Sequence, residues 1–252
     1  MSYEIPWHPV PKPNLYNLLI SKLRRFPFYQ RLWITGDYFS FFLERLIFNA
    51  TKKHKKIVDV GCREGKNLLF SSWAEFYVGV DIDFPSVQYA NNVSPFNAKA
   101  FLATGTALPF KEKSFDLVIC TEVIEHLAEY KKLVQNLARV CESGGEIILS
   151  TPNGRVVPKP YALHHKHFNE KELIELFSPF FEDIKIYSIV RNCSVKKPYW
   201  QLRNKYSSNN VIVILVSLLT NLVYLLKGYH SEGSDNRDDV TDANFILVGR
   251  RR

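Results

Sequence analysis

Short apolar runs recur along residues 55–251, and several of them are separated by segments with helical spacing. A short, continuous apolar run of this kind is typical of a strand buried on both faces. We predict such strands over 55–62, 77–83, 114–120, 146–150, 182–190 and 243–251. We predict helices over 64–76, 122–141 and 169–180. Apolar strands alternating with helices indicate an α/β fold with a doubly wound, mostly parallel sheet that helices cover on both faces.

The chain before the first predicted strand has a different pattern. Residues 1–13 are rich in proline, which suggests an extended arm. Apolar and aromatic residues then recur at helical spacing over 14–50. Pro27 and Gly36 divide this stretch into two or three helices. We therefore expect N-terminal helices ahead of the sheet.

Two regions are expected: a basic N-terminal helical cap over 1–56, and a main domain over 57–252 with an apolar helical insertion at 192–240 before the last strand. The most apolar part of the insertion is Val211–Leu226. A helix of this length measures roughly 24 Å, whereas the hydrocarbon core of a bilayer is about 30 Å thick. The strands on either side should join one sheet, so both ends must lie on one side of a membrane. We therefore expect a helix in the membrane interface, or a lid over the site.

The composition excludes several classes of protein. The chain has 252 residues, of which 46% are hydrophobic and 23% charged, so wholesale disorder is excluded. No apolar run reaches the roughly 18 residues of a plain membrane-spanning helix, and the N-terminal stretch lacks the pattern of a signal peptide. The four cysteines are scattered, which argues against a disulfide framework or a cysteine zinc site and fits a reducing cytoplasm. They are Cys62, Cys120, Cys141 and Cys193.

Positive charge is concentrated near the two ends of the chain, whose formal net charge is +8. Residues 1–56 contain ten Lys and Arg but three Asp and Glu, and residues 191–205 contain five Lys and Arg and no acid. An acidic run follows over 232–242. Basic ends suggest an anionic partner, either a lipid surface or a nucleic acid, although a solvated surface is the alternative. Tyr and Trp beside these cations suit an anionic membrane surface, so we expect peripheral membrane binding. Together with the cysteine pattern, this predicts a cytoplasmic protein that is peripheral at the membrane.

The first candidate for chemistry follows the first predicted strand. The loop Asp59–Gly65 contains two glycines, which allow a sharp turn and a close approach to a ligand. Its spacing matches neither the dinucleotide fingerprint nor a phosphate-binding GKS/GKT loop. The second strand brings Asp81, which lies about 20 residues after the loop and suits the two hydroxyls of a ribose. The alternative is a surface aspartate that caps the next turn, a role open to Asp81 and Asp83.

Four motifs, taken in order, resemble class I S-adenosylmethionine-dependent methyltransferases. They are VDVGCREG, VGVDID, ALPFKEKSFDLVICTEVIEHL and GGEIILSTPN, and the resemblance runs from about Ile57 to Val190. It implies a seven-stranded Rossmann-like methyltransferase fold and S-adenosylmethionine as cofactor. It also implies that Asp59, Gly61 and Gly65 surround the methionine part, Asp81 holds the ribose, Thr104 and Gly105 contact the adenine, and Cys120 lies beneath the sulfonium.

Two positions depart from the family pattern. Arg63 stands where the first motif has its middle glycine, and Thr104 stands where an aspartate is common. An arginine there either crowds the cofactor or points to solvent, and the Thr104 hydroxyl can still donate or accept a hydrogen bond. Neither change removes the ribose acid.

A second candidate site combines two stretches of the chain. Glu122, Glu125 and His126 have the i, i+3, i+4 spacing that places all three on one face of the predicted helix. Two carboxylates and an imidazole can bind a divalent cation or act as a base. Later comes the cluster His164–Phe168.

The combination is similar to two branches of the family, the ubiquinone-pathway O-methyltransferases and the small-RNA 2′-O-methyltransferases. The resemblance implies that Glu122, Glu125, His126 and His164 hold a Mg²⁺-like ion, which would orient a hydroxyl and lower its pKa. The alternative is an EH pair that only packs and hydrogen-bonds locally. We expect His165 and His167 to be surface residues rather than ligands.

These observations predict methyl transfer from S-adenosylmethionine to a hydroxyl of a small apolar or lipid-linked acceptor. His126 and His164 are the candidate bases, since both can titrate near neutral pH, with Glu122 as a further catalytic candidate. One alternative is an RNA 2′-O-methyltransferase, although no RNA-binding module is visible and a nucleic acid is the less favoured partner. The other is a catalytically silent, membrane-attached scaffold of the same fold.

Overall fold

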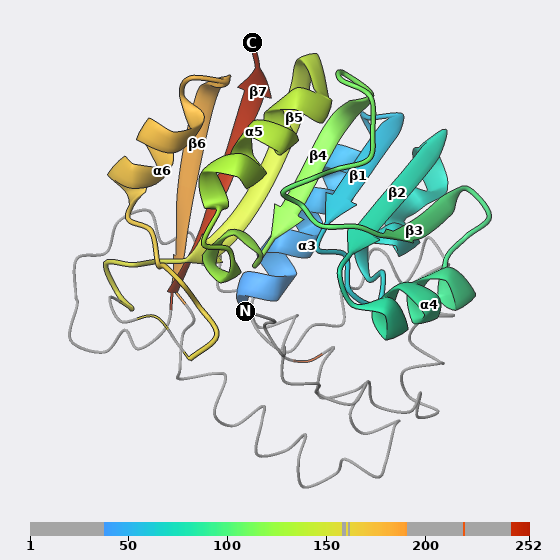
Figure 1. The fold of residues 1–252 in the computed structure, drawn as a ribbon, viewed down its shortest axis with the longest axis horizontal. Coiled ribbons are helices and arrows are strands. Elements are labelled where there is room, and N and C mark those ends of the chain that lie inside the picture. Colours follow the sequence, from blue (N-terminus) through green and yellow to red (C-terminus); the bar gives the residue numbers. More distant parts are fainter. Residues whose placement is uncertain (1–37, 158–159, 161, 191–218, 220–242) are drawn as a thin grey trace, which may run out of the picture.

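A seven-stranded sheet forms the centre of the computed structural model, which describes residues 38–157, 160, 162–190, 219 and 243–252. The strands are β1 (Lys56–Val60), β2 (Phe76–Asp81), β3 (Ala98–Leu102), β4 (Phe115–Thr121), β5 (Cys141–Pro152), β6 (Phe181–Val190) and β7 (Ala243–Arg251). Their order in the sheet is β3-β2-β1-β4-β5-β7-β6 (Figure 1). Only β7 pairs antiparallel to its neighbours, β5 and β6. The predicted mostly parallel, seven-stranded fold is therefore confirmed, with one antiparallel strand.

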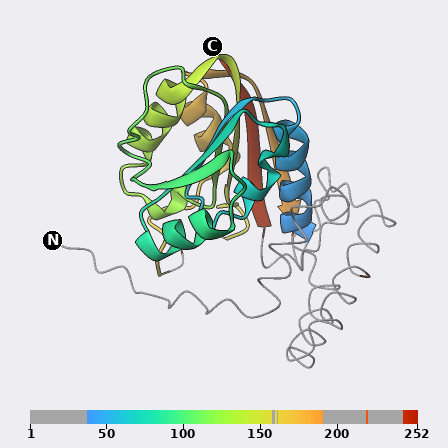
Figure 2. The ribbon, with the colours of Figure 1, turned by 90° about the vertical axis from the view of Figure 1, so that its right-hand side faces the viewer.

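Helices cover both faces of the sheet. They are α3 (Tyr38–Thr51), α4 (Phe84–Val93), α5 (Tyr130–Val140) and α6 (Glu170–Phe177), together with the short 3₁₀ segments η1 (Asn67–Trp73) and η2 (Ile124–His126). Seen along the edge of the sheet, α3 lies on one side, and α5 and α6 lie on the other (Figure 2). The sheet is thus wound on both faces, as a doubly wound fold requires.

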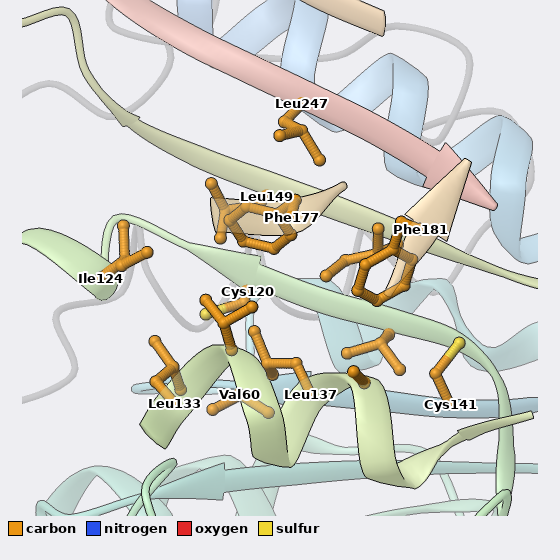
Figure 3. Close-up of a cluster of buried hydrophobic side chains, with 14 of the residues drawn as sticks. Val60, Cys120, Ile124, Leu133, Leu137, Cys141, Leu149, Phe177, Phe181 and Leu247 are labelled. Carbon is orange, nitrogen blue, oxygen red and sulfur yellow. The ribbon is translucent and has the colours of Figure 1, made fainter. Parts of the chain in front are cut away.

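Alternate residues of the central strands enter two separate hydrophobic clusters. On one face Ile57 and Ile119 pack with residues of α3, η1 and α4. On the other face Val118 and Leu149 pack with residues of α5 and α6 (Figure 3). Because each strand is buried on both sides, successive residues are apolar instead of alternating with polar ones. This double burial is the reason that the strands could be predicted as continuous apolar runs.

The predicted helix over 122–141 is wrong in its first half. Residues Ile124–His126 form the single turn η2, and the helix begins only at Tyr130. Glu122 has φ +55° and Leu127 is extended, so the backbone leaves helical geometry before and after this turn. Helical spacing therefore does not bring Glu122, Glu125 and His126 to one face.

Two elements were not predicted from the apolar pattern, namely β3 and α4. Strand β3 lies at the edge of the sheet, and three of its five residues are exposed. It therefore lacks the continuous apolar run of the central strands. Helix α4 is capped by Asp83, the residue before its first turn, whose side chain accepts from the backbone N–H of Ser86 at 3.0 Å.

Of the predicted N-terminal cap over 1–56, the structure describes only residues 38–56. Most of these form α3, and its Ile47 and Phe48 are buried in the cluster beneath the sheet. Phe48 makes edge contacts with Phe70 and Trp73 of η1, at ring-centroid distances of 5.6 and 5.2 Å. Helix α3 thus belongs to the same core as the sheet.

The insertion predicted at 192–240 lies outside the described residues, apart from Leu219. Its two ends are fixed by the sheet, because Val190 of β6 pairs with Ala243 of β7. Since β6 runs parallel to β1 and β4, this junction lies at the edge of the sheet where the parallel strands end. No helix in the described part of the chain is long and apolar enough to cross a membrane.

Candidate functional site

The loop after β1 folds tightly onto the end of β2. The N–H groups of Gly61 and Cys62 both donate to the carbonyl of Val80, at 2.8 and 3.1 Å. Gly61 has φ +80° and Gly65 has φ +75°, a region that favours glycine. A Cβ atom on Gly61 would lie 2.2 Å from Cγ2 of Val123, so the loop also contacts the segment after β4. Both glycines are therefore required by the shape of the loop.

Asp81 joins this loop to the end of β2. Its Oδ2 accepts from the backbone N–H of Arg63 at 2.8 Å, and its Oδ1 accepts from the N–H of Asp83 at 2.9 Å. Each carboxylate oxygen can accept further hydrogen bonds, so Asp81 retains capacity for ligand hydroxyls. Of the capping roles open to the two acids, Asp83 caps α4, and Asp81 caps the turn before it through the N–H of Asp83. The structure therefore brings the loop and Asp81 together, as expected for a ribose site.

Arg63 adopts φ +44°, which is unusual for a residue with a side chain. Its backbone N–H is used to hold Asp81, and its side chain is exposed. The Arg63 side chain could either crowd the cofactor or point to solvent, and it points to solvent.

Asp59 lies in β1, directly before the loop, and is buried. Its Oδ2 accepts from the side-chain amide of Asn67 at 3.1 Å, whereas its Oδ1 has no hydrogen-bond partner in the described residues. Burial raises the pKa of Asp59 to about 7; the hydrogen bond from Asn67 lowers this pKa and the charge of Asp81 raises it. A cationic donor beside Oδ1 would satisfy this carboxylate.

The residues predicted to contact adenine follow β3. The Thr104 hydroxyl lies 3.0 Å from that of Thr106, and a Cβ on Gly105 would lie 2.6 Å from Cδ1 of Leu133. Side chains of α5 donate hydrogen bonds to the backbone of residues 106–110, which follow Thr104 and Gly105. Asn136 donates to the carbonyl of Thr106 at 2.9 Å, and Arg139 donates to the carbonyls of Leu108 and Phe110 at 2.8 and 2.7 Å.

This support by Asn136 and Arg139 was not predicted. A polar residue and a cation on a helix read equally well as a solvated face, so the sequence carried no distinguishing signal.

Cys120 is fully buried near the end of β4. Its side chain belongs to the hydrophobic cluster that includes Val60, Leu133 and Leu137 (Figure 3). Burial raises the pKa of its thiol well above the ordinary value, so the group is uncharged. Any approach of Cys120 to the sulfonium stays a prediction.

Glu122 is held by two other strands. Its Oε1 accepts from the Ser150 hydroxyl and its Oε2 from the Asn244 side-chain amide, both at 2.8 Å. These partners lie in β5 and β7, close to the end of the sheet where the loop and Asp81 lie. Neither Ser150 nor Asn244 was predicted as a site residue, although both are polar residues near one end of an apolar strand.

Glu125, His126 and His164 form a compact cluster. One possible ligand atom from each residue lies within 4.8 Å of the others, and the two imidazole rings meet edge to face with centroids 4.4 Å apart. Three of the four predicted metal ligands thus come together in the described residues, while both oxygens of Glu122 are engaged elsewhere.

The Glu125 carboxylate is buried in this cluster. Its Oε2 accepts from the Thr151 hydroxyl at 3.0 Å. Its Oε1 has no hydrogen-bond partner in the described residues and lies 4.0 Å from Nε2 of His126. Burial, followed by the charge of Glu122, raises the pKa of Glu125 to about 8. A proton or a cation is therefore favoured at this carboxylate.

The histidines are oriented through their other ring nitrogens. Nδ1 of His126 lies 3.0 Å from the carbonyl of Leu163, and Nδ1 of His164 lies 2.7 Å from Nε2 of His167. Nδ1 of His167 in turn lies 2.6 Å from the carbonyl of Val157. Burial, with the neighbouring His126 and His167, lowers the pKa of His164 to about 4, which keeps the ring neutral.

The expectation that His167 is a surface residue is wrong, because it is buried and both its ring nitrogens face polar partners. His167 directly precedes Phe168, which is buried and bridges to Asn153 at the end of β5, and this pairing draws His167 inward. The neighbouring His165 is exposed, as expected.

Comparison with known proteins agrees with this geometry. Residues 58–149 match the family model described as a methyltransferase domain. A probable S-adenosylmethionine-dependent methyltransferase of Mycobacterium tuberculosis is 31% identical over 130 residues, which cover 48% of this chain and 46% of that protein. The ubiquinone biosynthesis O-methyltransferase of Idiomarina loihiensis is 29% identical over 55% of this chain and 66% of its own length. The chloroplastic tocopherol O-methyltransferase of Arabidopsis thaliana is 36% identical over 40% of this chain and 31% of its own length.

Solved structures share the fold at low sequence identity. The YcgJ protein of Bacillus subtilis has a TM-score of 0.54 at 19% identity and covers 83% of this chain and 97% of its own. Phosphoethanolamine N-methyltransferase 2 of Haemonchus contortus, solved with S-adenosyl-L-methionine, has a TM-score of 0.55 at 13% identity and covers 82% of this chain and 52% of its own. The [4+2]-cyclase SpnF has a TM-score of 0.56 at 14% identity, so the fold does not by itself fix the reaction.

Residues 58–149 thus match a methyltransferase domain, and the strand order and the contact of the glycine loop with Asp81 agree with the expected class I S-adenosylmethionine-dependent methyltransferase fold. The chain spans less than two thirds of the length of each curated relative described above.

Proposed function

We propose that this protein transfers the methyl group of S-adenosylmethionine to a hydroxyl of a small apolar or lipid-linked acceptor. The observation that carries the cofactor assignment is the hydrogen bond from the backbone of Arg63 to Asp81. It joins the glycine loop to an acid at the end of the neighbouring parallel strand, and ligands of such sheets bind beyond these strand ends.

The residues present fit the cofactor. Asp81 can accept from the ribose hydroxyls, and the buried, unpartnered Oδ1 of Asp59 suits a cationic donor such as the ammonium of the methionine part. Gly61 and Gly65 would admit the cofactor close to the backbone, and Thr104 and Gly105 would border the adenine. The cofactor supplies an electrophilic methyl group, so the remaining task of the protein is to position the acceptor and remove its proton.

The acceptor proposal rests on the second cluster and on two relatives. His126 and His164 lie in contact near the end of β4, and an imidazole can take a proton from a hydroxyl. The expectation that His164 titrates near neutral pH is wrong, because its pKa is lowered to about 4, which makes it a weak base. Relatives named as tocopherol and ubiquinone biosynthesis O-methyltransferases favour methylation at oxygen. The sequence of the insertion, with its apolar stretch, favours an apolar acceptor.

A divalent metal is a further element of this proposal. Glu125, His126 and His164 offer one oxygen and two nitrogen ligands, and Oε1 of Glu125 is a buried oxygen without a hydrogen bond. This donor set suits Zn²⁺, Mn²⁺ or Fe²⁺ better than Mg²⁺, which prefers oxygen ligands alone. These residues would hold the ion, which would supply positive charge beside the acceptor hydroxyl. Titration of Mn²⁺ and Mg²⁺ into the wild-type protein and into Glu125→Gln tests the site.

Calorimetric titration with S-adenosylhomocysteine tests the cofactor proposal. We expect Asp81→Asn to weaken binding at least tenfold, because one acceptor for the ribose hydroxyls is lost. Asp116→Asn is the matched control, since Asp116 has the same charge but accepts from the backbone of Lys55 and Lys56 at the opposite end of the sheet. Equal affinities for Asp81→Asn and the wild type would contradict the ribose site.

The acceptor class is tested with methyl-labelled S-adenosylmethionine and three kinds of acceptor: a prenylated phenol, a lipid-linked sugar and a small RNA. Labelling of the phenol or the lipid-linked sugar supports the proposal. Labelling of the RNA alone would support the 2′-O-methyltransferase alternative, and cofactor binding without transfer to any of them would support the silent scaffold.

We also propose that the basic ends attach the protein peripherally to an anionic membrane surface. Residues 1–37 and 191–205 of these stretches lie outside the described residues, so the support is their charge and their Tyr and Trp content. Flotation with phosphatidylserine vesicles should capture the protein at low salt and release it at high salt, and no capture would contradict the proposal.

A further inference from the structure

Two contacts in the histidine cluster form a chain of hydrogen bonds, and a backbone carbonyl determines which atom donates in each of them. It starts at the carbonyl of Val157, continues through His167 and ends on His164, with contact distances of 2.6 and 2.7 Å. A carbonyl oxygen can only accept a hydrogen bond. Nδ1 of His167 must therefore carry the hydrogen in the first contact.

The second contact follows from the first when the rings are neutral. A neutral imidazole has one N–H and one lone pair, so Nε2 of His167 accepts and Nδ1 of His164 donates to it. Nε2 of His164 then carries the lone pair. The same rule applied to His126, whose Nδ1 faces the carbonyl of Leu163 at 3.0 Å, leaves the lone pair on its Nε2 as well.

We propose that His167 is a positioning residue that fixes His164 in the Nδ1–H tautomer. Both rings of the His126–His164 pair then present Nε2 as the basic or metal-ligating nitrogen beside Glu125. The inference rests on the proposed function, because it assigns His167 a role only if His164 acts as base or ligand. An imidazole ligand or base is commonly oriented through a hydrogen bond at its other nitrogen.

The arrangement suits this role in two further respects. His167 is buried beside Phe168, whose backbone pairs with that of Asn153, the residue after β5. The position of the His167 ring is therefore fixed relative to the sheet. The backbone N–H of the intervening His165 donates to the carbonyl of Glu125 at 2.7 Å, which fixes the segment to η2. The tautomer is thus set by groups that are themselves held by the fold.

Substitutions at His167 separate hydrogen bonding from packing. His167→Gln keeps an acceptor for His164 and a donor for Val157, whereas His167→Phe keeps a ring but has neither. His165→Phe is the matched control, because the exposed His165 ring takes no part in the chain of contacts. Circular dichroism establishes that each variant is folded, and His167→Leu replaces His167→Phe if the latter is not.

The test is a long-range ¹H–¹⁵N correlation spectrum of ¹⁵N-histidine-labelled protein at pH 8, which reports which nitrogen of each ring carries the hydrogen. The His164 signals are assigned by their loss in His164→Gln. We expect Nδ1–H at His164 in the wild type, in His167→Gln and in His165→Phe, and a shift toward Nε2–H in His167→Phe. An Nε2–H tautomer in the wild type, or an unchanged tautomer in His167→Phe, would overturn the proposal.

A second readout uses Co²⁺ alone as the probe, followed by its visible absorption. Loss of an outer hydrogen bond to a ligating histidine typically weakens metal binding by roughly 10- to 100-fold, so we expect that loss in His167→Phe and recovery in His167→Gln. If the wild type binds no Co²⁺, the metal part of the proposed function fails, while the tautomer spectrum still decides the role of His167. Undiminished Co²⁺ affinity in a His167→Phe protein with an altered tautomer would overturn the positioning role.

Discussion

Asp81 on the proposed cofactor side and the two glutamates on the proposed acceptor side are held by different means. On the cofactor side, Asp81 accepts from two backbone N–H groups, those of Arg63 and Asp83. On the acceptor side, Glu122 and Glu125 accept from side chains of β5 and β7. Backbone donors are available at any residue once the loop has folded, whereas side-chain donors must be encoded at distant positions. The position of Asp81 thus depends on loop shape, and the positions of Glu122 and Glu125 depend on particular residues.

The largest expected effect comes from the loop. Gly61→Ala should cost about 3–5 kcal/mol or prevent folding, because it combines a left-handed φ with a contact of 2.2 Å to Val123. Urea denaturation measures the change. Gly144→Ala is the control, since Gly144 also has φ +80° but would place its Cβ in open space. It should cost only about 1–2 kcal/mol, and equal costs at the two positions would show that the contact with Val123 is unimportant.

The next effect concerns pH and the two buried acids. Burial raises the pKa of Glu125 from 4.5 to about 8 and that of Asp59 from 3.8 to about 7, so the folded protein binds these protons more tightly than the unfolded chain. The protonated carboxyl groups of these two residues stabilise the folded protein fully at low pH. This contribution to the free energy of unfolding is lost as the pH rises from about 5 to 8. Each unit of raised pKa corresponds to about 1.4 kcal/mol, so the free energy of unfolding should fall by a few kcal/mol across this window.

Denaturation with a chelator present at pH 5 and pH 8 measures this fall. Glu125→Gln should remove part of it, and Asp59→Asn should remove another part. A wild-type protein more stable at pH 8 than at pH 5 would contradict the assignment of these raised pKa values.

A smaller effect is expected at Glu122. Glu122→Ala leaves the Ser150 hydroxyl and the Asn244 amide without their shared acceptor, which should cost about 1–3 kcal/mol of stability. Because Glu122 is not one of the three residues whose ligand atoms lie within 4.8 Å of one another, Mn²⁺ affinity measured by calorimetry should change less in Glu122→Ala than in Glu125→Gln. A larger loss of Mn²⁺ affinity in Glu122→Ala than in Glu125→Gln would show that Glu122 is a metal ligand.

The smallest effect is expected at Arg63. Arg63→Gly removes a side chain from a left-handed position but increases the freedom of the unfolded chain, so stability should rise by about 1 kcal/mol or less. Affinity for S-adenosylhomocysteine should stay within about twofold, because the backbone N–H that holds Asp81 is kept. A clear loss of affinity would reveal a contact of the guanidinium with the cofactor.

The same contrast explains which parts of the molecule could be predicted from the sequence. The central strands were predicted because burial on both faces leaves continuous apolar runs. Asp81 was predicted because it lies at the end of the strand after the glycine loop, at the spacing usual for a ribose-binding acid. The edge strand β3 was missed because its residues are half exposed.

The acceptor side could be predicted only in its residue types. Glu125, His126 and His164 lie together as the family resemblance implied, but the geometry predicted for Glu122, Glu125 and His126 assumed a helix that is absent there. Glu122 turns toward Ser150 and Asn244, and the latter is 122 positions away along the chain. His167 was taken for a surface residue because a run of histidines gives no sign of which ring the fold will bury.

The pairing of Val190 with Ala243 has a practical consequence for how such a protein can diversify or be engineered. Everything between these two residues departs from and returns to one point on the hairpin of β6 and β7, so a short reverse turn could replace it without straining either strand. Chain closure there depends only weakly on length, at about 0.6 kcal/mol per doubling. Foreign sequences could therefore be grafted at this junction while the pairing of β6 with β7 is left as it is.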